Sequence, residues 1–134
     1  METPHALIVE DTPELAEIFS MALMAAGYQT QVLDNGQSAR QFLATEAPDL
    51  LLLDIHLPHY NGDRLLEEVR QLPHLAQTLV ILATADTRRG EELRDVADFV
   101  LQKPISFTQL RDLSSRLTAA MPRLQNGRLD HNSA

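Results

Sequence analysis

Asp49-Leu50-Leu51-Leu52-Leu53-Asp54 is the stretch of this sequence that decides the fold. Its leucines run without interruption between two acids, so both faces of an extended segment here are apolar. A strand that is apolar at every position is typical of a parallel sheet covered on both faces, whereas a half-exposed strand alternates. We therefore predict a buried strand over residues 49–54 that ends at the carboxylate of Asp54.

Segments of strand and helix character alternate on both sides of this run. The other expected strands cover residues 6–9, 28–33, 79–83 and 99–101. Helices are expected from Pro13 to Gly27, around residues 39–43 and 65–72, from Arg88 to Asp95, and from Ser106 to Leu117. Strands separated by helices imply right-handed crossovers. The sequence thus predicts an α/β fold, with a doubly wound parallel sheet and helices on both faces.

Two of these helices have recognisable starts. Thr12 stands where a hydroxyl would cap the first helix, and Pro13 occupies its first turn. Ser106 and Gln109 have the spacing of a capping box before the last helix. The pair Arg88-Arg89 fits a patch for an acidic partner, but it is expected to be a solvated helix start.

The composition of the chain narrows the classes of function. Its 134 residues suffice for one domain, and the absence of cysteine excludes a disulfide framework and thiolate chemistry. The net charge of −8 argues against nucleic acids and anionic membranes as partners. No apolar run approaches the roughly 20 residues that span a bilayer, and residues 1–5 lack the basic start of a secretory signal. We therefore expect a cytoplasmic protein.

Polar side chains stand at the ends of four of the predicted strands. Glu10 and Asp11 follow the first strand, and Asp54 ends the third. Thr84 follows the fourth strand and Lys103 the fifth. Ligands of open parallel sheets bind beyond the carboxyl ends of the strands. These five residues are therefore expected to converge on one rim of the sheet.

The residue types at this rim suit phosphoryl transfer. Three carboxylates in one place repel one another, and Mg²⁺ removes that repulsion at a site with few carboxylates. Lys103 supplies a compact positive charge for an anionic oxygen, and the Thr84 hydroxyl can donate a hydrogen bond to the same anion. One of the carboxylates is then a candidate nucleophile that forms an acyl phosphate.

Four segments, in this order and spacing, resemble the motifs of CheY-like response-regulator receiver domains. They are Leu7-Ile8-Val9-Glu10-Asp11, Leu53-Asp54-Ile55-His56-Leu57-Pro58 through Asn61-Gly62, Leu82-Ala83-Thr84-Ala85, and Lys103-Pro104. The resemblance covers residues 5–120 and implies a flavodoxin-like sheet of five strands in the order 2-1-3-4-5. Residues 121–134 are expected to form a short, polar and flexible tail, with no output domain.

The resemblance also implies a metal site. Asp11 and Asp54 would ligate Mg²⁺ directly, and Glu10 would act largely through water. The backbone carbonyl of His56 would be a further ligand. The side chains of His56 and His59 have no implied metal role, because the family uses only the backbone of the first.

The function implied by the resemblance is phosphorylation-dependent signalling. Asp54 would accept a phosphoryl group from a sensor histidine kinase or a phosphotransfer protein. Thr84 and Lys103 would contact the phosphoryl oxygens, and the Lys103-Pro104 peptide would be cis. Such a single-domain response regulator would signal by binding a downstream protein, or by forming a homodimer through the expected helix at 88–95, the strand at 99–101 and the last helix.

Three alternative functions fit parts of the sequence. An aspartyl-phosphate phosphohydrolase similar to the haloacid dehalogenases would carry an acid two residues after Asp54, where this chain has His56, and a substrate cap. A non-phosphorylated receiver-like binding module would have a damaged acid pocket, whereas the pocket residues are all present. A flavodoxin-like nucleotide binder would need a Gly-rich or hydroxyl-rich first loop, whereas Glu10 and Asp11 would repel phosphate.

One position departs from the pattern of the family. Receiver domains often carry an aromatic residue three positions before the lysine, and its rotamer follows phosphorylation; this chain has Val100 there. Phe99 does not replace it, because neighbouring strand residues face opposite sides. Valine is short and stiff at χ1. We therefore expect loop and backbone shifts over residues 85–91, rather than a side-chain rotation, to distinguish the two states.

Overall fold

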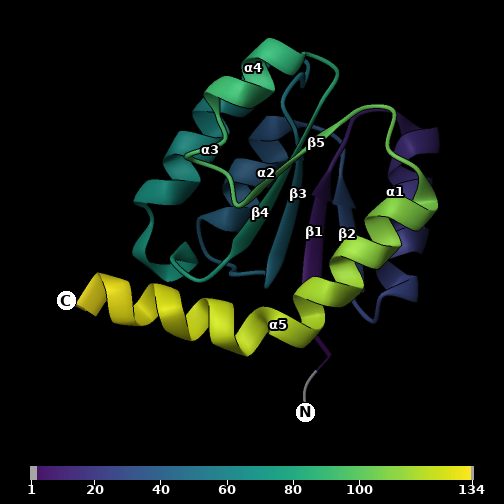
Figure 1. Cartoon of the computed structure of the whole chain (residues 1–134). Helices are drawn as coiled ribbons and strands as arrows, with labels where there is room; N and C mark the ends of the chain where they lie inside the picture. Colours follow the sequence, from purple (N-terminus) through teal and green to yellow (C-terminus); the bar gives the residue numbers. More distant parts are fainter. Residues whose placement is uncertain (1–2, 134) are drawn as a thin grey trace.

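In a computed structural model of the chain, five parallel strands form a single sheet in the order β2-β1-β3-β4-β5 (Figure 1). The structure describes the backbone of residues 3–133 and the side chains of residues 3–121. The strands are β1 (His5–Val9), β2 (Gln29–Leu33), β3 (Leu50–Asp54), β4 (Leu79–Thr84) and β5 (Phe99–Gln102). The predicted fold class and strand order are confirmed.

Helices cover both faces of the sheet. They are α1 (Pro13–Ala25), α2 (Gly36–Leu43), α3 (Gly62–Gln71), the short 3-10 helix η1 (Pro73–Leu75), α4 (Thr87–Glu92) and α5 (Phe107–Ser133). Helices α1 and α5 lie on one face, and α2, α3 and α4 on the other (Figure 1). Leu51 and Leu53 pack toward the α2–α3 side, while Leu50 and Leu52 pack toward α1 and α5. Both faces of β3 are therefore buried, which is why its first four residues are all leucine.

The helix starts agree with the sequence in part. Pro13 is the first residue of α1, and the amide of Gln109 donates to the Ser106 hydroxyl at 3.0 Å, as predicted. The prediction of a Thr12 hydroxyl cap is wrong, since that side chain makes no capping bond. Pro13 already removes one of the amide donors that a cap would serve. The carboxylate of Glu10 instead accepts the Thr12 amide at 3.2 Å.

The ends of the last two helices differ from expectation. Helix α4 stops at Glu92, short of the expected Asp95, because the chain beyond it turns inward to bury Leu93. Helix α5 continues to Ser133, through the segment predicted as a tail, and it bends along its length (Figure 1). Pro122 lies inside α5, and a proline inside a helix removes one helical hydrogen bond and favours a kink. Although α5 is 27 residues long, none of the helices among the described residues is both long and apolar enough to cross a membrane.

Strand β5 places its first two residues on opposite faces of the sheet. Val100 packs against the core on the α2–α3–α4 side, and Phe99 packs against the core on the α1–α5 side. The expectation that Phe99 cannot take the place of a residue at position 100 is therefore confirmed.

Candidate functional site

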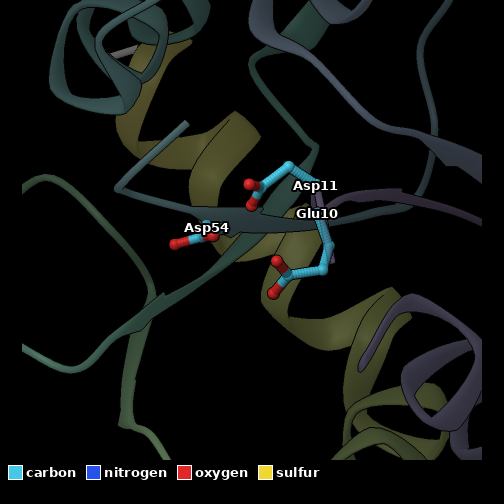
Figure 2. Close-up of side chains that lie close together, drawn as sticks. All are labelled: Glu10, Asp11 and Asp54. Carbon is cyan, nitrogen blue, oxygen red and sulfur yellow. The ribbon is translucent and has the colours of Figure 1, made fainter. Parts of the chain in front are cut away.

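Three acids converge at the carboxyl ends of β1 and β3 (Figure 2). Strands β1 and β3 are direct neighbours, with Val9 opposite Leu53, so the residues that follow them meet. One carboxylate oxygen from each of Glu10, Asp11 and Asp54 lies within 4.8 Å of the others. Glu10 and Asp54 are buried, with 2% and 4% exposure, whereas Asp11 faces solvent. The predicted acid cluster is therefore assembled, with one open side.

Lys103 reaches this cluster from the end of β5. Its ammonium lies 2.8 Å from Glu10 Oε1 and 3.3 Å from Asp54 Oδ2. Its backbone amide donates to the Thr84 carbonyl at 2.8 Å, and the Lys103-Pro104 peptide is cis, as the resemblance implied. One ammonium thus faces three carboxylates, and the site keeps an excess of negative charge.

Burial and the neighbouring charges shift the pKa values of Glu10 and Lys103. Burial raises the pKa of Glu10, the hydrogen bond from Lys103 opposes that rise, and the charge of Asp54 adds to it. Burial alone would lower the pKa of the Lys103 amine, but the bond to Glu10 and the charges of Asp54 and Glu10 raise it above its usual value. The folded state therefore holds the Lys103 proton firmly. The ionised Glu10 opposes folding, and that cost falls as the pH drops through its raised pKa.

Both oxygens of Asp54 have a polar neighbour. The His56 amide donates to Oδ1 at 3.0 Å, and Lys103 faces Oδ2. The loop after Asp54 is held by a close approach, since Gly62 donates from its amide to the Ile55 carbonyl at 3.2 Å. The predicted ligation of a metal by the His56 carbonyl stays a prediction.

Thr84 ends β4, next to the acid cluster in the sheet. Ala83 lies opposite Asp54 in the register of the two strands. The Thr84 hydroxyl is buried and bonds the backbone of Asp86: it accepts from the amide at 2.9 Å and lies 3.4 Å from the carbonyl oxygen. Asp86 in turn caps α4 by accepting from the Arg89 amide at 3.1 Å. In this state the hydroxyl is therefore turned toward the β4–α4 loop.

An ion pair that the sequence did not predict lies beside the acids. A cleft of about 680 Å³ runs from Asp11 and His56 to Asp63, Asp86 and Arg89. Arg88 and Arg89 were both expected to be solvated, and Arg88 is, with 92% of its side chain exposed. The side chain of Arg89 is only 37% exposed, and its Nε donates to Asp63 Oδ2 at 2.5 Å. The sequence does not indicate this contact, because 26 residues separate Arg89 from Asp63. No periodic pattern in the sequence links α3 to α4, so only the fold reveals the pair.

The donor set of the acid cluster fits a hard divalent cation. Mg²⁺ prefers carboxylate oxygens and keeps several waters. Glu10, Asp11 and Asp54 supply such oxygens, and the exposed position of Asp11 leaves room for water on one side. A cation here would also offset the excess negative charge of the cluster.

Mg²⁺ is expected to raise the melting temperature of the protein, because the folded acid cluster binds the ion and the unfolded chain does not. Asp11→Ala should lose most of this response and should itself melt higher without the metal, since one repulsive charge is gone. Thermal unfolding followed by circular dichroism, with a Mg²⁺ titration, measures both effects. Asp95→Ala removes an exposed charge outside the cluster and serves as the control. An equal response of all three proteins to Mg²⁺ would contradict the site.

Comparison with known proteins gives a consistent result for most of the chain. A family model for the response regulator receiver domain matches residues 6–114. The sensor histidine kinase TmoS of Ectopseudomonas mendocina is 32% identical over 122 residues, which are 87% of this chain and 12% of that protein. The transcriptional regulatory protein BaeR of Escherichia coli O6:H1 is 33% identical, over 78% of this chain and 43% of that protein. The chain thus spans less than half the length of these curated relatives.

A solved structure gives the same result. A response regulator from Chloroflexus aurantiacus J-10-fl is 27% identical with a TM-score of 0.79, covering 88% of this chain and 99% of that one.

Proposed function

The chain belongs to the response regulator receiver domain family, and on that premise we propose that it accepts a phosphoryl group on Asp54 in a Mg²⁺-dependent reaction. One observation supports this proposal more than any other. Asp54 is a buried carboxylate that has the Lys103 ammonium on one oxygen, a backbone amide on the other, and two further acids within reach of a shared cation. An aspartate that only caps a helix or lies solvated in a loop does not need an ammonium, a backbone amide and two further acids around it.

The residues of the site divide the proposed reaction among them. Receiver domains interact with histidine kinases or phosphotransfer proteins, and a phosphohistidine is the proposed donor. An Asp54 oxygen attacks the phosphorus, the phosphorus–nitrogen bond breaks, and the imidazole leaves with the bonding pair. The chemistry that Mg²⁺ supplies when bound is neutralisation of charge on the acids and the phosphoryl oxygens.

Lys103 and Thr84 would then bind the phosphoryl group. The Lys103 ammonium already lies between Glu10 and Asp54, so a short movement brings it onto a phosphoryl oxygen. The Thr84 hydroxyl, which now bonds the Asp86 backbone, has to turn toward the acceptor to donate there. The proposed phosphorylation therefore changes the contacts of the β4–α4 loop.

Output through protein contact completes the proposal. A groove of about 260 Å³ lies between β5, α5 and the turn that follows α4. Apolar side chains of β5 and α5 line it together with basic Arg94 and Arg116 and acidic Asp98. Such a surface suits a downstream partner or a second copy of the chain that offers apolar and acidic groups.

The proposed reaction is tested with a small-molecule donor. Incubation with acetyl phosphate and Mg²⁺ should add one phosphoryl group to the protein, and the same incubation with EDTA should add almost none. Intact-mass spectrometry measures the occupancy directly. Equal labelling with and without the metal, or no labelling in either case, would argue against the proposal.

A further inference from the structure

Arg89 ties α4 to α3 at the edge of the cleft described above. Its Nε donates to Asp63 Oδ2 at 2.5 Å, and a terminal nitrogen contacts the same oxygen, so the pair is forked. Its other terminal nitrogen lies 2.5 Å from Glu92 Oε2. The side chain of Asp63 is 17% exposed and that of Arg89 is 37% exposed, so solvent screens the pair only in part. The structure therefore holds the first turn of α3 and the short helix α4 together.

The next residue of α4 connects this pair to the candidate acceptor site. A side-chain carbon on Gly90 would lie 3.1 Å from Thr84 Cγ2 and 3.0 Å from Val100 Cγ1. The backbone of α4 therefore packs directly on the two residues. A movement of Thr84 toward Asp54 therefore changes the packing contact between Thr84 and α4. Val100 is too short and too stiff at χ1 to fill the space that Thr84 leaves, so α4 itself has to shift.

We propose that the Arg89–Asp63 pair is a latch that holds α4 in the unphosphorylated position and opens when Asp54 is phosphorylated. The inference rests on the function proposed above. The Thr84 hydroxyl has to leave the Asp86 backbone to reach a phosphoryl oxygen, and Asp86 caps the same helix turn that carries Arg89. Because α4 packs on Thr84 through Gly90, the reorientation of Thr84 moves α4 relative to α3 and separates Arg89 from Asp63.

The latch predicts a change in the affinity of any ligand that binds only the phosphorylated conformation. An ion pair that exists only in the resting state stabilises that state, so it weakens any ligand that needs the other state. Removal of a partly exposed pair of this kind is expected to tighten such a ligand about fivefold. The neighbouring Arg88 gives a matched control, because its side chain is 92% exposed and lies 3.7 Å from Glu92, on the same helix.

Beryllofluoride with Mg²⁺, a mimic of the phosphoryl group, is the probe for this latch. Its apparent affinity and the amide shifts of residues 85–91 are measured by nuclear magnetic resonance on the full chain. Arg89→Gln and Asp63→Asn should each bind the probe about fivefold more tightly than the wild type. Their unliganded shifts over residues 85–91 should also move toward the bound positions. The double variant should gain no more than either single variant, Arg89→Lys should fall between Arg89→Gln and the wild type, and Arg88→Gln should match the wild type.

The outcomes separate the latch from the proposed function. If the wild type binds no beryllofluoride at Asp54, the phosphoacceptor proposal itself fails. If the wild type binds it and Arg89→Gln and Asp63→Asn bind it with unchanged affinity, the latch is refuted and the acceptor site stands. Additive effects in the double variant would likewise show that the two residues do not act as a pair. Circular dichroism confirms that each variant is folded, and the Asp63 variant tests the latch from the other helix.

Discussion

Asp54→Asn is expected to abolish phosphorylation of this chain by acetyl phosphate. The substitution keeps the size of the side chain and its place at the end of β3, but an amide is uncharged and a poor nucleophile. Intact-mass spectrometry should show one added phosphoryl group on the wild type and none on the variant. The matched control is Asp49→Asn at the other end of the same leucine run, where the acid accepts the His5 amide at 2.8 Å outside the acid cluster.

Labelling of the Asp49 variant should equal that of the wild type. If Asp54→Asn were labelled as fully as the wild type, another residue would be the acceptor and the assignment of Asp54 would be wrong. If both variants lost labelling, the effect would come from the fold of β3 and not from the acceptor carboxylate.

Gly62→Ala is expected to lower the free energy of unfolding by about 2 kcal/mol, because the added carbon has no space. It would lie 2.6 Å from the Ile55 carbonyl oxygen, 2.7 Å from Ile55 Cα and 2.9 Å from the Asp54 carbonyl oxygen. All three atoms belong to the backbone that positions the acceptor, so the loop after β3 has to shift. The rate of labelling by acetyl phosphate should fall together with the stability.

Urea unfolding followed by circular dichroism measures this loss, since the chain contains no tryptophan. Gly90→Ala is the comparison variant. Its new carbon would meet two methyl groups at 3.0 and 3.1 Å, and alanine has a higher helix propensity than glycine within α4. It should lose clearly less stability than Gly62→Ala. A Gly62 variant as stable as the wild type would show that the close approach of α3 to the acceptor loop is not a constraint.

The sequence predicts the sheet because β3 combines two properties that few segments share. Its four leucines require cover on both faces of the strand. The acid at its end marks the edge of the sheet where a site can form. The strand ends then bring Glu10, Asp11, Asp54 and Lys103 together by topology alone.

The features that the sequence does not predict are contacts between residues far apart in the chain and local choices for which more than one outcome is allowed. Arg89 and Asp63 form an ion pair because the fold brings the first turn of α3 close to α4, which no local pattern in the sequence indicates. Helix α5 continues past Pro122, and local rules allow a proline either to end a helix or to kink it. The direction of the Thr84 hydroxyl likewise depends on the loop that follows β4.

The modified residue itself gives the most direct test of the central claim. The wild type is labelled with acetyl phosphate and Mg²⁺ and then reduced with borohydride, which converts an aspartyl phosphate to homoserine. Peptide mass spectrometry then locates the change in the chain. We expect homoserine at position 54 alone, and none after incubation with EDTA. Homoserine at position 11, or an unchanged residue 54 in a protein that carries the label, would contradict the claim that Asp54 is the phosphoacceptor.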